Sequence, residues 1–497
     1  MGKDAAITPR AEDYSAWYLD VIDQADLLDD APVRGCKVFK PNGYGIWELI
    51  QRDLDQRFKD TGHVNAYFPL FIPLSFLSKE AEHVEGFAKE CAVVTHHRLA
   101  GVTREDGTRA VEPDPESKLE EPLIVRPTSE TVIWHMYGRW IDSWRDLPLL
   151  INQWANVVRW ELRTRPFLRT AEFLWQEGHT AHASSDEAVE ETERMLDVYA
   201  DFCRETLAVP VVKGIKSANE RFAGAVETYT IEALMQNGWA LQSGTSHFLG
   251  QNFAKAFDVT FQDSEGNREH VWATSWGVST RLIGAVVMTH SDDDGLVLPP
   301  KVAPTQVVVI PVGKSKDLPA VMEQVDPIVA RLKAAGIRVK VDDRDNVRPG
   351  AKYFEWERKG VPLRLEVGPR DLAKGQFFSK TRIGKDKFGI AFETVVDDVK
   401  RVLEEVQAEL LAKATAFREA RTFDADTREE FEAILTGDTP GFIKVPWGGD
   451  SADEKRVNDE TKASIRCYPL GAGKPDGLTC PLTGKPAWTW ALFARAY

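Results

Sequence analysis

Two short segments of the chain combine arginine, carboxylate and aromatic side chains. Arg159 and Glu161 alternate along an expected strand, so they should project from one face. On an expected return strand, Arg169 and Phe173 should share a face as well. A guanidinium can bind phosphate through two hydrogen bonds, a carboxylate can accept an exocyclic amino group, and a flat ring can stack on a base. The pattern predicts a cradle for adenine and phosphate, although Arg and Glu also alternate on many exposed strands.

The sequence lacks the common loops and signatures that bind nucleotides or metals. It has no GxxxxGK[ST] loop, no HExxH, no nucleophile elbow and no EF-hand loop. The Gly43-Tyr44-Gly45 segment lacks the third glycine of a dinucleotide fingerprint. His179 and His182 could offer two nitrogens to a metal, but no third ligand is evident, which favours a structural or substrate-contact role.

The charge balance excludes a uniformly basic nucleic-acid coat. Lys and Arg total 62 and Asp and Glu total 77, so the net charge of the 497 residues is 62 − 77 = −15. An acidic protein repels polyphosphate at long range. From residue 338 to residue 387, however, 14 basic residues face 8 acidic ones, a local excess of +6. This segment is either a solvated face or a local patch that contacts RNA.

The compartment is expected to be the cytoplasm. The five cysteines are few and scattered, which is typical of a reducing environment. No segment approaches the roughly 18 apolar residues of a membrane helix, and the N-terminus has no apolar signal core. We therefore expect no membrane association.

The strand and helix signals divide the chain into three units. Up to residue 298, separate strand-like runs and a helix at 46–58 indicate an α+β unit with an antiparallel sheet. After a proline-rich linker, strands and helices alternate, which indicates a small α/β domain. A long helix beginning near residue 395 leads into a segment rich in Gly, Pro and Trp. The expected domains are 1–298, 305–408 and 409–497.

Several longer strings resemble the class II aminoacyl-tRNA synthetases, and closely the prolyl-tRNA synthetases of the archaeal and eukaryotic type. Residues 67–73 resemble motif 1 of the class, residues 159–179 resemble motif 2, and residues 277–284 resemble motif 3. Residues 126–130 and 242–247 resemble the amino-acid loops of the proline enzymes. The resemblance covers nearly the whole chain. It implies a class II antiparallel-sheet catalytic domain, an α/β anticodon-binding domain and a small α+β C-terminal domain.

The resemblance also implies roles for individual residues. Arg159 and Arg281 would be the catalytic groups, and proline would contact Arg159 with Thr128, Glu130 and His247. The ATP site would consist of Arg159, Glu161, Arg169, Thr170, Phe173, Gln242, Thr245, Ser279 and Arg281. Mg²⁺ would accompany ATP near Gln242. Proline, ATP and tRNA(Pro) would be the substrates, joined in two steps through prolyl-adenylate with AMP and pyrophosphate as products.

The α/β domain would read the anticodon of tRNA(Pro), whose last two bases are guanines. Arginine suits the O6 and N7 edge of guanine, and carboxylates suit its ring N–H groups. The candidates are Arg348, Lys352, Glu355, Glu357, Arg364 and Glu366, although each could equally be an exposed charge.

The chain departs from the family pattern in two places. Motifs 2 and 3 are separated by 277 − 179 = 98 residues, which leaves no room for a large editing insertion. A pocket that admits proline cannot strongly reject smaller residues. We therefore expect mischarging with alanine or cysteine unless a separate editing protein acts.

The second departure concerns zinc. The C-terminal domain that the resemblance implies usually carries four zinc-binding cysteines. Here Gly448, Asp453 and Thr483 stand at three of these positions and only Cys480 remains, so no zinc is expected.

Motif 1 implies a homodimer. Two alternatives stay open: a related synthetase for threonine, histidine or glycine, and a non-catalytic RNA-binding or regulatory paralogue.

Overall fold

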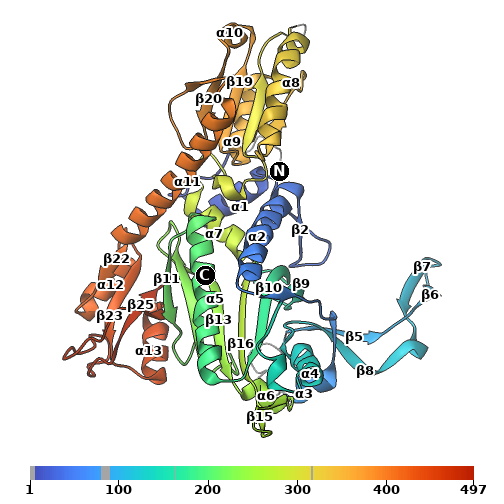
Figure 1. Ribbon diagram of the computed structural model, residues 1–497, viewed down its shortest axis with the longest axis vertical. Helices are drawn as coiled ribbons and strands as arrows, with labels where there is room; N and C mark the ends of the chain where they lie inside the picture. The colour runs from blue at the N-terminus through green and yellow to red at the C-terminus, as the bar shows by residue number, and fades with distance from the viewer. Residues whose placement is uncertain (1–5, 80–89, 162, 315–316) are drawn as a thin grey trace.

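A computed structural model describes residues 6–79, 90–161, 163–314 and 317–497 of the chain. Figure 1 shows an α/β unit at one end of the long axis and a large sheet in the rest of the molecule. The long helix α11 (Val395–Ala420) runs from the α/β unit to the C-terminal strands. No helix of the described residues is long and apolar enough to cross a membrane.

The large sheet has eleven strands in the order β22-β23-β25-β24-β11-β12-β13-β16-β10-β9-β3. All neighbours are antiparallel except the pairs β3–β9 and β22–β23, which confirms the expected antiparallel class. The strands are β3 (Val64–Asn65), β9 (Leu149–Val158), β10 (Glu172–His182), β11 (Val211–Ile215), β12 (Glu227–Leu234), β13 (Ala240–Gly250), β16 (Trp272–Ser279), β22 (Thr422–Asp424), β23 (Phe442–Trp447), β24 (Ser464–Pro469) and β25 (Thr489–Ala494).

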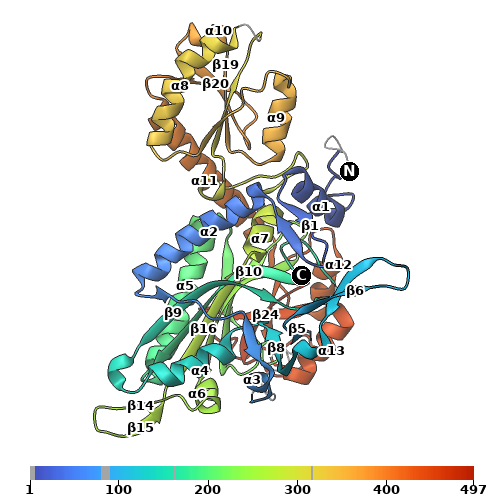
Figure 2. The ribbon, with the colours of Figure 1, turned by 90° about the vertical axis from the view of Figure 1, so that its right-hand side faces the viewer.

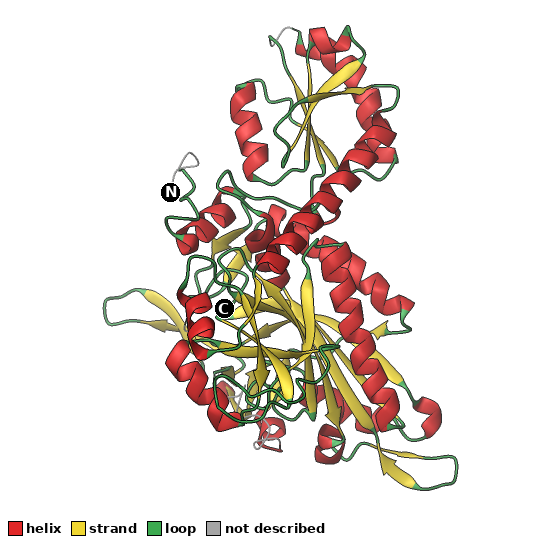
Figure 3. Cartoon of the chain, turned by 90° about the vertical axis from the view of Figure 1, so that its left-hand side faces the viewer, coloured by secondary structure: helices red, strands yellow, loops and turns green. Residues whose placement is uncertain are grey.

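One face of the catalytic strands is closed by helices α2 (Pro41–Asp60) and α5 (Ser185–Glu205). Figure 3 shows α5 lying along the sheet. The Trp276 ring of β16 lies 5.0 Å from the Phe58 ring of α2 and 6.3 Å from the Tyr199 ring of α5, measured between centroids. Gly178 of β10 makes room for this indole, because a Cβ there would lie 2.1 Å from it. The opposite face is left for the site described below.

Helix α2 begins five residues earlier than the expected helix at residue 46. Gly43 and Gly45 therefore lie inside its first turns rather than in a preceding loop. At Gly43 a Cβ would lie 2.2 Å from the Leu27 carbonyl oxygen, so only glycine allows this close approach. Pro41 begins the helix at a position where its missing N–H costs no hydrogen bond.

The remaining elements of the catalytic unit surround the large sheet. Figure 2 shows the β6–β7 and β14–β15 hairpins projecting from it. These remaining elements are α1 (Tyr14–Gln24), β1 (Leu28–Asp30), β2 (Lys37–Phe39), β4 (Phe71–Pro73), α3 (Leu74–Lys79), β5 (Ala92–His96), β6 (Leu99–Thr103), β7 (Arg109–Pro113), β8 (Lys118–Val125), α4 (Glu130–Trp140), α6 (Asn252–Ala256), β14 (Thr260–Gln262), β15 (Arg268–His270) and α7 (Arg281–His290).

The α/β unit contains a five-stranded sheet in the order β18-β17-β19-β20-β21. Its first three strands are parallel, as alternating strands and helices predict, whereas β20 and β21 add an antiparallel edge. Its elements are β17 (Val307–Pro311), α8 (Leu318–Ala334), β18 (Val339–Val341), α9 (Pro349–Arg358), β19 (Leu363–Val367), α10 (Pro369–Leu372), β20 (Gln376–Thr381) and β21 (Phe388–Ala391).

The C-terminal unit extends the catalytic sheet. Its strand β24 pairs with β11 through Gly214 opposite Pro469 and Ile215 opposite Tyr468. The unit also contains α12 (Arg428–Thr436) and α13 (Ser451–Thr461). Helix α11 passes through residues 408 and 409 without a break, so the two downstream units share this helix.

Candidate active site

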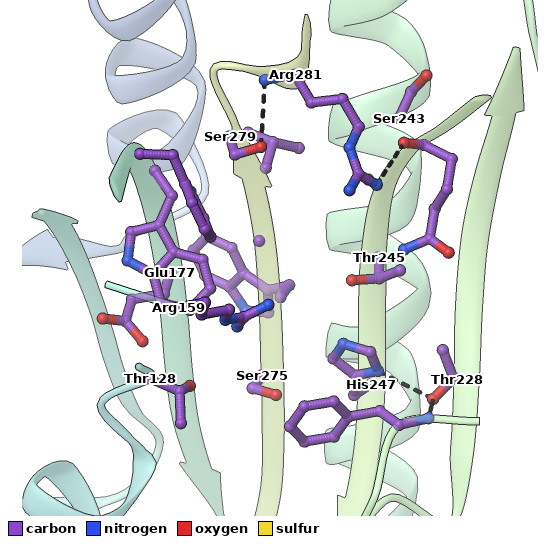
Figure 4. Close-up of a pocket in the computed structure, with 18 of the residues that line it drawn as sticks. Thr128, Arg159, Glu177, Thr228, Ser243, Thr245, His247, Ser275, Ser279 and Arg281 are labelled. Atoms are coloured by element: carbon purple, nitrogen blue, oxygen red, sulfur yellow. Dashed lines mark hydrogen bonds between the residues drawn. The ribbon is translucent and has the colours of Figure 1, made fainter. Parts of the chain in front are cut away.

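A cavity of about 660 Å³ lies on the open face of the catalytic sheet. Figure 4 shows side chains from neighbouring strands pointing into it, with Arg159 and Arg281 reaching in from separate segments. All twelve residues predicted for the ATP and proline sites line this cavity. They are Thr128, Glu130, Arg159, Glu161, Arg169, Thr170, Phe173, Gln242, Thr245, His247, Ser279 and Arg281.

The expected strand alternation around Arg159 and Arg169 is wrong. Strand β9 ends at Val158 and β10 begins at Glu172, so Arg159, Glu161 and Arg169 all lie in the connection between the two strands. The chain stays paired just beyond the strands, because the Arg159 N–H donates to the Ala171 carbonyl at 2.8 Å. The loop, rather than the pleat, brings these side chains to the cavity.

The Arg159 guanidinium is fixed by its own loop and by two rings of β10. Its Nε donates to the Pro127 carbonyl at 3.0 Å. Its Cζ lies 5.5 Å from the ring centroids of both Phe173 and Trp175. Burial lowers the pKa of Arg159, although Glu130 and Glu177 oppose that shift. The side chain is therefore a preorganised cation with restricted orientation.

Arg281 enters the cavity from the N-terminus of α7. Its Nη1 donates to the Gln242 carbonyl at 3.4 Å and its Nε to the Leu168 carbonyl at 3.3 Å. Burial, followed by repulsion from Arg169 and Arg159, lowers the pKa of Arg281 to about 10. Three arginines thus contribute positive charge to one cavity, an arrangement that an anion would stabilise.

The loop residues of the predicted adenine end lie beside one another. Glu161 accepts the Arg163 N–H at 2.7 Å and lies 3.6 Å from the Nε of Arg169. The Thr170 hydroxyl donates to the Glu172 carbonyl at 2.7 Å.

The predicted proline end combines a buried carboxylate with a neutral histidine. Glu130, only 5% exposed, accepts a hydrogen bond from the Thr128 hydroxyl. His247 lies 3.0 Å from the Thr228 hydroxyl and 4.5 Å from the Phe222 ring. Burial, with a smaller contribution from His179, lowers the pKa of His247 to about 3, so its imidazole is neutral near pH 7. A cationic amine would find a carboxylate here and no competing imidazolium at His247.

The sequence analysis assigned no site role to Trp175 and Glu177 of β10, and named His179 only as a structural or substrate-contact residue. Trp175, Glu177 and His179 follow Phe173 at every second position and all line the cavity. Extending the strand period of two beyond Phe173 would have identified them. Glu177 accepts hydrogen bonds from the Ser129 hydroxyl at 2.5 Å and the Gln153 amide at 2.8 Å.

Glu177 and His179 form a buried pair, with 3.0 Å between Oε2 and Nε2. Burial opposes the charged form of both groups, but their mutual attraction prevails, so the pKa of Glu177 is lowered and that of His179 is raised. Nδ1 of His179 and the hydroxyl of Ser275, which also line the cavity, are buried without a hydrogen-bond partner among the described residues. Polar atoms in this position suit contact with a ligand.

The six predicted anticodon residues lie on or beside two elements. Arg348 precedes α9, α9 carries Lys352, Glu355 and Glu357, and β19 carries Arg364 and Glu366. Arg348 is exposed, whereas Lys352 is 2% exposed and donates to the Asp342 carbonyl at 2.9 Å. Arg364 and Glu366 are also buried and pair at 3.0 Å. Two further carboxylates are already paired within the unit: Glu355 with Arg344 and Lys359, and Glu357 with Lys380.

The expected remnant of a zinc site contains an ion pair. Cys480 is fully buried, and its N–H donates to the Lys485 carbonyl at 2.8 Å. The Lys485 ammonium lies 2.6 Å from Asp453 and 3.1 Å from Asp450. Within the described residues, no group of three or more His, Cys, Asp or Glu side chains could hold a metal.

Comparisons with known proteins agree with this geometry. Residues 111–290 match the family "tRNA synthetase class II core domain (G, H, P, S and T)", and residues 306–402 match "Anticodon binding domain". Residues 428–497 match "Prolyl-tRNA synthetase, C-terminal". The chain is 59% identical over 493 residues to a proline–tRNA ligase of Porphyromonas gingivalis, covering 99% of each chain.

The chain belongs to the proline–tRNA ligase family of class II aminoacyl-tRNA synthetases. Relatives of the same name in Cytophaga hutchinsonii and Bacteroides fragilis are each 58% identical, over 98% and 99% of this chain and 99% of each relative. The family membership confirms the expected enzyme class and fold. It also decides against the threonine, histidine and glycine families, because the C-terminal match is specific to prolyl-tRNA synthetases.

Proposed function

We propose that this chain ligates L-proline to tRNA(Pro) in two steps. The proline carboxylate attacks the α-phosphorus of ATP, which forms prolyl-adenylate and releases pyrophosphate. A ribose hydroxyl of the tRNA 3′ adenosine then takes the prolyl group and AMP leaves. The observation that carries this proposal is the convergence of Arg159 and Arg281 in one cavity that also holds the buried Glu130.

Each end of the cavity suits one substrate. Glu161, Phe173 and Arg281 would hold adenine and the phosphates, together with Arg169, Thr170, Gln242, Thr245 and Ser279. Thr128, Glu130 and His247 would hold proline, with Glu130 as the partner of its cationic secondary amine. Arg159 would orient the carboxylate toward the α-phosphate. Catalysis would come from positioning and charge stabilisation.

The donor set of the cavity is compatible with Mg²⁺ bound through ATP. Gln242 lines the cavity, and amide and phosphate oxygens are ligands that this ion accepts. When bound, Mg²⁺ would neutralise phosphate charge. In the C-terminal unit, we propose that the ion pairs of Lys485 and the packing of Trp447, 1% exposed, replace a structural zinc.

We also propose that the enzyme is of the archaeal and eukaryotic type without an editing insertion. The 277 − 179 = 98 positions from His179 to Gly277 are occupied by elements of the catalytic unit, α5 to β15. Such an enzyme would mischarge tRNA with alanine or cysteine unless an editing protein acts separately.

A homodimer and a cytoplasmic location complete the proposal. Tyr67 and Phe71 in the motif 1 segment are 71% and 47% exposed, and Val93, on β5 of the same three-stranded sheet as Phe71, is 52% exposed. Exposed large apolar side chains in the motif 1 segment and on its sheet are compatible with a subunit interface. Residues 1–298 would act in catalysis, residues 305–408 in anticodon reading through the six positions named above, and residues 409–497 as a C-terminal domain.

The test is ATP–pyrophosphate exchange measured with each of the twenty amino acids. Proline should support the fastest exchange, and alanine and cysteine a slower one. Exchange that is faster with threonine, histidine or glycine would refute the specificity. The absence of exchange with all twenty would refute the catalytic proposal.

A further inference from the structure

Three buried ionisable side chains meet where the C-terminal unit joins the catalytic sheet. The Glu232 carboxylate of β12 lies 3.0 Å from Lys216 Nζ, and its other oxygen lies 3.1 Å from Arg466 Nε and Nη2. Glu232 is fully buried, Lys216 is 1% exposed and Arg466 is 6% exposed. Burial raises the pKa of Glu232, but the two cations outweigh burial and the pKa is lowered. The three buried groups therefore carry a net charge of +2 − 1 = +1, and the more exposed Glu220 lies 4.0 Å from Lys216 at the edge of the cluster.

This cluster continues the same face of the sheet that forms the active-site cavity. Thr228, Thr230 and Glu232 alternate along β12, and Thr228 lines the cavity. The Thr230 hydroxyl donates to Glu232 at 3.0 Å. Glu232 lies directly opposite Gln242 of β13, whose carbonyl accepts the 3.4 Å hydrogen bond from Arg281. The carboxylate thus lies on the strand position adjacent to the group that holds Arg281.

The charges of this cluster reach Arg281. Attraction to Glu232 raises the pKa of Arg281, whereas repulsion from Arg466 lowers it. Both groups therefore contribute to the potential at the cavity end that we assign to the phosphates. Arg466 is 234 residues away from Glu232 in the sequence and belongs to the C-terminal unit.

We propose that Arg466 is a positioning residue for ATP, acting from the C-terminal unit through Glu232. It holds the Glu232 carboxylate beside Gln242 and gives the cluster the excess positive charge that attracts the triphosphate. The inference rests on the proposed function of the cavity. It assigns to the C-terminal unit a part in ATP binding as well as in folding.

Removal of the Arg466 charge should weaken ATP binding specifically. In Arg466→Met the cluster falls from +1 to 0. A unit charge on the order of 10 Å from a phosphate changes binding about tenfold in a protein environment. We expect the KM for ATP in proline-dependent exchange to rise about tenfold. The KM for proline should stay within about twofold, because the charge lies at the other end of the cavity.

A double variant separates charge from packing. Glu232→Gln combined with Arg466→Met leaves Lys216 as the single charge, so the cluster regains its net +1. The double variant should recover most of the ATP affinity that Arg466→Met loses. Arg466→Lys retains the charge without the planar fork and should also stay near the wild-type KM for ATP. Arg428→Met, which removes a partly exposed arginine of α12 that pairs with Glu432 and Glu460, is the matched control.

The experiment is ATP–pyrophosphate exchange at varied ATP and varied proline, with thermal unfolding of each variant. An unchanged KM for ATP in folded Arg466→Met would overturn the inference. So would a double variant as weak as Arg466→Met, since packing would then be the cause. If Arg466→Met does not fold, a double variant with a KM for ATP tenfold above that of Arg466→Lys would overturn it as well. A wild-type enzyme without proline-dependent exchange would refute the proposed function instead.

Discussion

Replacing Arg159 with alanine should nearly abolish proline-dependent ATP–pyrophosphate exchange. The Arg159 guanidinium is fixed by the Pro127 carbonyl at 3.0 Å and by two rings at 5.5 Å, so little reorganisation is needed when charge develops on the α-phosphate. Loss of one preorganised donor of this kind lowers kcat by roughly 10²- to 10³-fold. Because Arg159 would contact both phosphate and carboxylate, we expect the upper end, about a thousandfold or about 4 kcal/mol.

A lysine at the same position tests geometry separately from charge. Arg159→Lys keeps a cation but loses the planar fork that binds two oxygens at once. We expect it to lose about a hundredfold in kcat, between the wild type and the alanine variant.

The control for both variants is Arg104→Ala, which removes an exposed arginine in the turn between β6 and β7. Initial rates of exchange at saturating ATP and proline, together with the thermal midpoint, distinguish a catalytic loss from a folding loss. An alanine variant that is folded and exchanges within about threefold of the wild type would refute the role of Arg159.

Three further outcomes follow from the structure. Glu130→Gln should raise the KM for proline at least about thirtyfold with little change for ATP, because it removes a buried carboxylate from the amine; equal rises for both substrates would contradict this. His179→Gln should cost most stability between about pH 4.5 and 6.5, where Glu177 is ionised and His179 is protonated. The pKa of His179 is raised, so the stability that His179 contributes declines as pH rises. The pKa of Glu177 is lowered, so the stability that Glu177 contributes declines as pH falls. Urea unfolding at pH 5.5 and pH 9 measures the difference, and an equal cost at both would be contrary to it. Elemental analysis of the purified chain should find well under one zinc per molecule, and one tightly held zinc would disprove the zinc-free C-terminal unit.

The motifs correctly predicted which residues share the cavity, but not which secondary-structure elements carry them. All twelve predicted residues line one cavity, but Arg159, Glu161 and Arg169 are carried by a loop. The alternation of Arg and Glu looks like a strand, yet nothing local marks its end at Val158. In the turn that follows, Phe167 has a φ of 60°, in the left-handed region. Glycine usually occupies this region, and its absence here left the turn unpredicted from the sequence.

Charged residues of the α/β unit show a different limit. Lys352 and Arg364 are charged side chains in a locally basic segment, and the sequence could not distinguish exposed charges from buried pairs. Lys352 of α9 is buried against Asp342, which follows β18, whereas Arg364 pairs with Glu366 two positions along the same strand, β19. Such pairing is decided by tertiary contacts that hydrophobic periodicity does not encode.

The C-terminal unit holds both ends of the cavity through separate contacts. Arg466 contacts Glu232 beside the end that we propose for ATP, whereas Glu454 of α13 accepts a 2.6 Å hydrogen bond from Ser217, in the segment that leads to Phe222 at the end that we propose for proline. General loosening of this unit should therefore raise the KM values for ATP and proline together. A change confined to Arg466 should raise only the value for ATP. The ratio of the two KM values thus separates an electrostatic contribution of this unit from a merely structural one.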